Sequence, residues 1–202
     1  DSIEPSPAEK GDEVTFNGAG SDSDGTIVAY QWESSIDGEL STEEDFSSSA
    51  LSLGHHAITF MVQDNDGDWG SVSRGLWIYA IPVALAGDDT TVSPGDTVQF
   101  SGQGTDEDGN IAKYEWDFDG NGIYEWSSEE NGRTTNIYNN EGTFTAVLRV
   151  TDNDGFTSTD SRIITVSKAG GGDDGGGGIP APSLAAAVAA VAVIALRRPR
   201  KP

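Results

Sequence analysis

The chain has 202 residues, enough for one large domain or two small ones, and its 26 glycines together with the lack of a long helical period favour two small β units. Its 34 acidic and 11 basic side chains give a formal net charge of −23, which excludes nucleic acid and anionic membrane surfaces as partners and suits salty medium or divalent cations. No cysteine is present, which excludes disulfides, thiolate metal sites and cysteine catalysis.

Short runs of alternating apolar and polar residues follow one another from the N-terminus to about residue 167. A period of two predicts strands with one buried and one exposed face, and the Asp-Gly steps between the runs supply tight turns. In chain order the predicted strands centre on Val14–Phe16, Tyr30–Trp32, Ile58–Val62, Leu76–Ile78, Val98–Phe100, Tyr114–Phe118, Phe144–Val150 and Ile164–Val166. This succession is typical of an antiparallel β-sandwich.

The second half of the series repeats the first. Gly11-Asp12 recurs 84 residues later as Gly95-Asp96, whereas Asp64-Asn65-Asp66-Gly67 recurs 88 residues later, so the second copy holds four extra residues. A period above 80 residues indicates tandem domains, each with its own core. The repeated acidic pairs are interpreted as turn caps: Asp22/Asp24 with Asp106/Asp108, and Asp64/Asp66 with Asp152/Asp154.

Three motifs of the second copy point to a family. It has Gly-Asp-Thr-Val from Gly95, Tyr-Glu-Trp-Asp-Phe-Asp-Gly from Tyr114 and Val-Thr-Asp-Asn-Asp-Gly from Val150. In this order and spacing each copy resembles a PKD (polycystic kidney disease) repeat, although the first copy has Glu-Ser-Ser-Ile-Asp-Gly after Trp32, where the signature loop is degraded. The resemblance covers about residues 3–167. It implies an all-β chain of two tandem immunoglobulin-like sandwiches, which we place at residues 1–80 and 81–167.

The resemblance implies a module that acts as a spacer, a stiffening element or an adhesion domain, not an enzyme. The histidines and the motifs of the sequence are consistent with this. The two histidines, His55 and His56, are neighbours on a predicted strand and face opposite ways, so they cannot grip one metal; we expect one to be partly buried and one solvated. No nucleophile elbow, zinc-protease motif or P-loop occurs. Carboxylate pairs such as Glu129-Glu130 are expected in so acidic a chain, and we interpret them as solvated surface charge.

A calcium site is the sharper prediction. Asp117, Asp119, Asn121 and Glu125 place side-chain oxygens at positions one, three, five and nine around a glycine turn, as in the first part of a calcium loop. The twelfth position, where a bidentate glutamate closes such loops, is Ser128. Two interpretations stay open: a weak calcium site with these four residues as ligands, or a long hairpin whose polar residues only make turns.

Outward-facing aromatic residues are a second binding clue. If Leu76 and Ile78 face the core, Trp77 and Tyr79 point outward, and Trp69 lies in the preceding turn. They could stack on a carbohydrate or anchor a protein ligand on the sandwich surface. Alternatively, Trp77 and Tyr79 pack at the contact between the two domains, where a short Pro-containing linker predicts a stiff tandem.

The tail reverses the charge of the body. Residues 168–183 are a flexible Gly/Pro-rich linker, and residues 184–202 are predicted as an apolar helix followed by Arg197, Arg198, Arg200 and Lys201. The basic end should stay cytoplasmic and leave the body outside. This layout is similar to C-terminal sorting signals of the archaeal PGF-CTERM type, although Pro180-Ala181-Pro182-Ser183 departs from that motif. A processed signal and a retained membrane anchor both remain open.

Together these features predict a non-catalytic protein of the cell surface, anchored in the membrane at its C-terminus, that displays two PKD-like domains as a stalk or adhesion module. Two alternatives remain. The chain starts at Asp1 rather than Met, so it could be the C-terminal accessory region of a larger secreted protease or glycan hydrolase. It could also be a calcium-dependent binding module, with calcium as its only cofactor.

Overall fold

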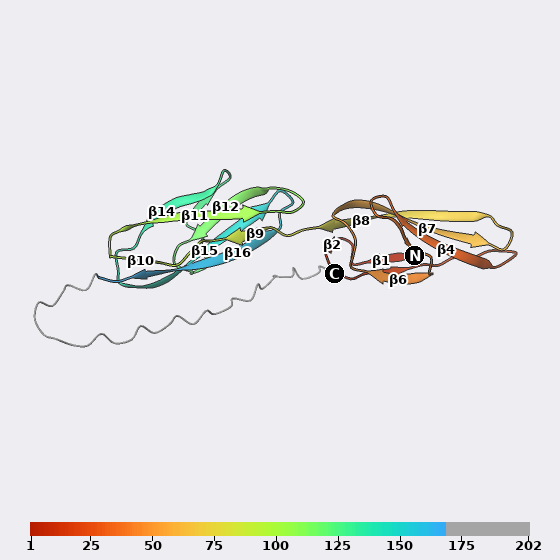
Figure 1. Ribbon diagram of the computed structural model, residues 1–202, viewed down its shortest axis with the longest axis horizontal. Helices are drawn as coiled ribbons and strands as arrows, with labels where there is room; N and C mark the ends of the chain where they lie inside the picture. Colours follow the sequence, from red (N-terminus) through yellow and green to blue (C-terminus); the bar gives the residue numbers. More distant parts are fainter. Residues whose placement is uncertain (169–202) are drawn as a thin grey trace, which may run out of the picture.

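The computed structural model describes residues 1–168, and all of them that lie in regular elements are in β-strands. The strands form two domains that follow one another end to end along the long axis of the molecule (Figure 1). The predicted apolar helix and all but the first residue of the predicted linker lie outside the described residues. Within residues 1–168 there is no helix long and apolar enough to span a membrane.

The first domain is a sandwich of two sheets. A three-stranded sheet has the order β1-β3-β6, and a five-stranded sheet has the order β2-β8-β7-β4-β5. The strands are β1 (Ser2–Glu4), β2 (Ala8–Glu9), β3 (Val14–Asn17), β4 (Ile27–Ser34), β5 (Gly38–Ser41), β6 (Asp45–Ser48), β7 (Gly54–Asp64) and β8 (Trp69–Tyr79).

The second domain has the same plan. Its three-stranded sheet has the order β14-β11-β9, and its five-stranded sheet has the order β10-β16-β15-β12-β13. The strands are β9 (Val83–Leu85), β10 (Thr90–Val92), β11 (Thr97–Thr105), β12 (Ile111–Asp117), β13 (Trp126–Ser128), β14 (Gly132–Ile137), β15 (Gly142–Asp152) and β16 (Thr157–Val166).

The prediction of a purely antiparallel sandwich is wrong for one pair in each domain. β2 runs parallel to β8, and β10 runs parallel to β16. The reason lies in the path of the chain, because in each domain the first strand pairs in the small sheet and the next one crosses to the edge of the large sheet. All other pairs are antiparallel, as the alternating pattern predicted.

One tryptophan lies at the centre of each core. It comes from β4 in the first domain, before the degraded signature loop, and from β12 in the second domain, before the intact one. Trp32 and Trp116 are 1% and 0% exposed, and their indole N–H groups donate to the carbonyl oxygens of Glu44 and Gly132 at 3.1 and 3.0 Å. Alternate residues of the predicted strands point inward, as the period of two requires. The first core contains Val14, Phe16, Ile58, Phe60, Leu76 and Ile78; the second contains Val98, Phe100, Ala146, Leu148, Val150, Ile164 and Val166.

The two copies differ most where the large sheet turns back on itself. In the first domain residues 35–37 connect β4 to β5, whereas in the second residues 118–125 connect β12 to β13. The longer loop follows directly from the end of β12 at Asp117, so the candidate calcium ligands lie at one end of the second sandwich. The other end of that sandwich meets the first domain, since only residues 80–82 separate β8 from β9.

Candidate functional site

The loop of residues 118–125 is folded around the carboxylate of Asp117. This side chain is 2% exposed, and its Oδ1 accepts hydrogen bonds from the backbone N–H groups of Asp119, Gly120 and Asn121 at 3.2, 2.7 and 3.3 Å. Its Oδ2 accepts a further bond from Gly122 N–H at 2.7 Å. Several backbone N–H groups that point at a buried carboxylate offset the cost of removing it from water.

Two glycines make the tight course of the loop feasible. Gly120 and Gly122 have φ values of +74° and +89°, a region that other residues rarely enter. A Cβ atom on Gly120 would also lie 2.8 Å from the carbonyl oxygen of Thr145. The hydroxyl of Tyr138, the residue after β14, donates to the carbonyl oxygen of Phe118 in the loop at 2.7 Å. Burial raises the pKa of Tyr138, so this hydroxyl keeps its proton.

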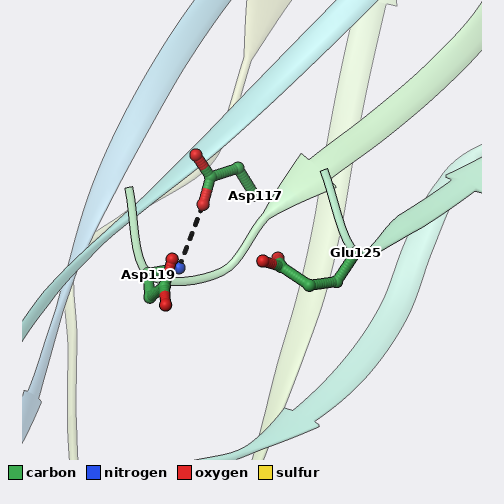
Figure 2. Close-up of side chains that lie close together, drawn as sticks. All are labelled: Asp117, Asp119 and Glu125. Atoms are coloured by element: carbon green, nitrogen blue, oxygen red, sulfur yellow. Dashed lines mark hydrogen bonds between the residues drawn. The ribbon is translucent and has the colours of Figure 1, made fainter. Parts of the chain in front are cut away.

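Three of the four predicted calcium ligands meet in this loop. One carboxylate oxygen each from Asp117, Asp119 and Glu125 lie within 4.8 Å of one another, and Figure 2 shows the Glu125 side chain reaching across toward the two aspartates. Asp119 and Glu125 are exposed, and Glu125 Oε2 accepts the N–H of Phe118 at 2.8 Å. Clustered carboxylate oxygens are ligands that Ca²⁺ prefers.

The other residues of the predicted loop act in its turns. The side chain of Asn121 accepts the N–H of Ile123 at 2.7 Å, and Ser128 Oγ accepts the N–H of Glu130 at 3.1 Å. Asp119 Oδ1 likewise accepts the N–H of Asn121 at 3.2 Å. These side chains therefore make the turns of the hairpin, as one interpretation predicted, and calcium binding by the same residues stays a prediction.

A surface hollow of about 370 Å³ lies beside the three carboxylates. It is lined by Asp119 and Glu125 together with the rings of Phe118, Tyr138 and Phe144 and the amide of Asn136.

On the same large sheet, Glu115 is paired with two cations. Lys113 Nζ and Arg149 Nε lie 2.7 and 2.8 Å from its carboxylate oxygens, and the Arg149 guanidinium sits 3.9 Å above the Tyr124 ring. Burial opposes ionisation of Glu115, but the hydrogen bonds from Lys113 and Arg149 outweigh it and hold its pKa below the ordinary value. This group is a neutralised structural cluster, not a free acid.

The histidines behave as the sequence predicted. His55 is exposed, and His56 is 2% exposed. Because His56 Nε2 faces the carbonyl oxygen of Ser52 at 2.8 Å, it carries the proton, and Nδ1 accepts the Ser34 hydroxyl at 2.7 Å. Both ring nitrogens are thus occupied in the core. The Ser34–His56 pair was missed from the sequence, since neither its spacing nor its neighbours signal it.

Trp77 and Tyr79 pack at the contact between the domains, which confirms one of the two predicted alternatives. Tyr79 stacks on Phe156 of the second domain with ring centroids 4.1 Å apart and planes 5° from parallel. Trp77 lies 5.9 Å from Phe156 and 5.1 Å from the ring of His55. Trp69, at the opposite end of β8, is 50% exposed.

The repeated aspartates only partly act as turn caps. Asp22, Asp64 and Asp152 each accept the backbone N–H two residues later, as predicted. Burial raises the pKa of Asp106, and the N–H of Asp108, two residues later, offsets part of this rise, as expected of a turn cap. Asp108 itself has a different role, because its Oδ2 accepts the N–H of Ala80 in the linker at 3.0 Å. The sequence could not show the bond between Asp108 and Ala80, because it joins residues 28 positions apart.

Comparison with protein families settles the class of both domains. Models described as "PKD domain" match residues 2–73 and residues 79–166. The chain belongs to the PKD domain family. PKD domains are immunoglobulin-like modules of the binding type and are not catalytic, so the described residues form two non-catalytic modules in tandem.

Several curated proteins contain a similar PKD region. The dyslexia-associated protein KIAA0319 homolog of Rattus norvegicus is 30% identical over 165 residues, 75% of this chain and 15% of the relative. Collagenase ColA of Clostridium perfringens is 41% identical over 86 residues, 42% of this chain and 7% of the relative. The pre-pro-metalloprotease PrtV of Vibrio cholerae is 30% identical over 150 residues, 72% of this chain and 15% of the relative. The chain thus spans a small part of each relative.

Proposed function

We propose that the chain is a non-catalytic stalk or adhesion module that displays two PKD domains at the cell surface. The proposal rests on the junction between the two domains. There the short linker of residues 80–82 is held in place by the Tyr79–Phe156 stack and by the Ala80–Asp108 hydrogen bond. A tandem fixed in this way holds its far end away from its attachment point, as a spacer must. The net charge of −23 favours solubility in salty medium.

The anchoring part of this proposal rests on the tail alone. The apolar stretch within residues 184–202 and its basic end would hold the chain in a membrane with both PKD domains outside, either as a retained anchor or as a sorting signal of the PGF-CTERM type. The test is protease treatment of intact cells that make the protein, followed by the intact mass of the membrane-extracted chain. Loss of the PKD domains to the protease and a membrane-bound remnant are expected. Full protection, or recovery of the whole protein from the soluble fraction, refutes it.

A second candidate function follows from the relatives. The similarity to a collagenase and a metalloprotease suggests an accessory region of a larger secreted protease or glycan hydrolase. The same mass measurement distinguishes the two, because a native protein far heavier than 21.2 kDa would carry further domains. A catalytic domain in the reading frame upstream of Asp1 would decide for the accessory role.

A third candidate, a calcium-dependent binding module, is favoured by the cluster of Asp117, Asp119 and Glu125. A site of this kind in an extracellular module has a dissociation constant of about 0.1–1 mM. Calcium at ten times that value would stabilise the second domain by about 1.4 kcal/mol. The test is calorimetry of the full chain with calcium and with chelator, using Asp119→Ala and, as control, the exposed Glu129→Ala. An equal calcium response in wild type and Asp119→Ala would rule out this loop.

A further inference from the structure

One sheet edge of the second domain differs from the other edges in residues 1–168. The four sheets end in eight edge strands: β1, β2, β5, β6, β9, β10, β13 and β14. Seven of them have two to four residues, whereas β14 has six. Backbone N–H and C=O groups on the open side of an edge strand are a template for another strand, and proteins limit such pairing by keeping edge strands short or charged. The β14 edge is not protected by shortness.

The β14 edge also has no acidic side chain. Its sequence is Gly-Arg-Thr-Thr-Asn-Ile, so Arg133 is its one charged residue in a chain of net charge −23. The counterpart in the first domain, β6, begins with Asp45, directly after Glu43 and Glu44. Two edges of that kind would repel each other. The first domain is therefore protected here by both length and charge, whereas the second domain is protected by neither.

The outward face of β14 consists of Arg133, Thr135 and Ile137. All three side chains are exposed, whereas Thr134 lies opposite the buried Phe100 of β11. Within residues 1–168, Arg133 forms no ion pair, although acidic residues far outnumber basic ones. Ile137 is 50% exposed. This face therefore offers a ligand one free cation and one apolar side chain.

The two ends of β14 have complementary charges. Arg133 lies near the start of the strand. Ile137, its last residue, lines the hollow of about 370 Å³ that the exposed carboxylates of Asp119 and Glu125 also line. An antiparallel partner strand with the same sequence would bring its own arginine to this acidic end. The edge is thus complementary to a second copy of itself.

We propose that β14 is a self-association surface, where a second copy of this chain pairs through its own β14, antiparallel, about a twofold axis at Thr135. Strand pairing keeps outward residues opposite outward residues, so Arg133 of each copy lies opposite Ile137 of the other. The aliphatic part of Arg133 covers that isoleucine, and the guanidinium pairs with the carboxylates of Asp119 and Glu125 beside it. Each contact occurs twice, because a twofold interface uses the same surface of both copies.

The size of this interface makes the pairing weak and dependent on concentration. A strand of six residues is about 20 Å long, so the contact is smaller than the roughly 800 Å² per partner that stable complexes bury. Many copies side by side on one surface raise the effective concentration and strengthen such a contact. The pairing itself does not depend on the membrane location proposed above, so either proposal can fail alone.

Single cysteines test the position of the twofold axis, because the chain has no cysteine of its own. Thr135→Cys places a thiol opposite its own copy, and directly opposite Cα atoms are about 4.5–5.5 Å apart, within disulfide range. Gln99→Cys is the matched control, since Gln99 is exposed and lies opposite Thr135 on the central strand β11. The full chain is treated with oxidised glutathione in mild detergent and chelator. Thr135→Cys should form the disulfide dimer at least about tenfold faster than Gln99→Cys.

Charge reversal tests the ion pairs, by sedimentation equilibrium of the full chain in the same detergent and chelator. Arg133→Glu and Asp119→Lys should each self-associate less than wild type, because like charges then meet. Their equimolar mixture should recover association, since each new glutamate meets a new lysine. The recovery should amount to about 2- to 30-fold in the dissociation constant for two exposed ion pairs. Asp66→Lys makes the same charge change in the first domain and should not replace Asp119→Lys in the mixture.

Three results overturn the proposal. The first is a wild-type chain that stays monomeric at every concentration. The second is an equal rate of cross-linking for Thr135→Cys and Gln99→Cys, which would show that β14 meets no second β14. The third is a mixture of Arg133→Glu and Asp119→Lys that associates no better than either variant alone. Circular dichroism of each variant checks that it is folded, and the cysteine test stands without the charge variants.

Discussion

Removing the stack between Tyr79 and Phe156 should uncouple the two domains. Their ring planes are 5° from parallel and their centroids 4.1 Å apart, so the pair is a stacked contact rather than an incidental one. Aromatic pairs of this geometry contribute about 0.5–1.5 kcal/mol beyond the area they bury. Tyr79→Ala and Phe156→Ala should therefore show a coupling free energy in that range, with the double variant less destabilised than the sum of the single ones.

The cycle is measured by urea unfolding of the full chain in wild type, both single variants and the double variant. It isolates the pair because other contacts of either ring, such as that between Trp77 and Phe156, cancel unless the variants rearrange the junction. A matched cycle on Tyr138 and Phe144, whose centroids lie 4.7 Å apart inside the second domain, should show coupling in urea unfolding of the second domain without affecting the first. A coupling free energy below about 0.3 kcal/mol for Tyr79 and Phe156 would mean that the two residues act independently. It would refute the inference that their stack couples the domains.

Three further predictions concern the second domain. Trp116→Ala should lower its stability by about 3–5 kcal/mol, since the side chain is fully buried, and calorimetry should show a large downward shift of one transition with the first domain's transition retained. Gly120→Ala should cost at least about 1–2 kcal/mol in urea unfolding, because φ is +74° and the new Cβ would meet the Thr145 carbonyl oxygen, whereas Gly122→Ala, with open space around it, should cost less. The lowered pKa of Glu115 means that its stabilisation is present above its ordinary value of 4.5 and is lost as the pH falls through the folded-state value; Glu115→Gln should flatten that acid-side loss, and an unchanged pH profile would contradict the assignment.

The sequence predicted the sandwich well because the information is local. Alternation in Val98 and Phe100 decides which face of β11 is buried, and the structure buries both. The two-residue strand β2 was beyond such reasoning, because Ala8 and Glu9 are too few to show a period and pair with β8 only through the path of the chain. The parallel pairs were missed for this reason.

The candidate sites also differ in whether the information that defines them is local in the sequence. The carboxylates of Asp117, Asp119 and Glu125 come together within one loop, so spacing alone predicted their proximity. Calcium binding there remains a prediction. The buried carboxylate oxygens of Asp106 and Asp152 could not be predicted, because these residues are 46 positions apart in the sequence and their burial depends on the folded structure. Burial of that kind leaves no trace in the local sequence.

The parallel edge pairs also determine how the molecule responds to a pull along the chain. β10 is the second strand of the second domain and β16 is its last, and they run side by side through Thr90–Val92 and Ile164–Val166. Tension applied through the two ends drags these strands past each other, so their hydrogen bonds are loaded together in shear rather than opened one at a time. In the first domain β2 and β8 share only two residue pairs, against three here. The first domain should therefore yield first when the tandem is stretched, and the second should hold at a higher force.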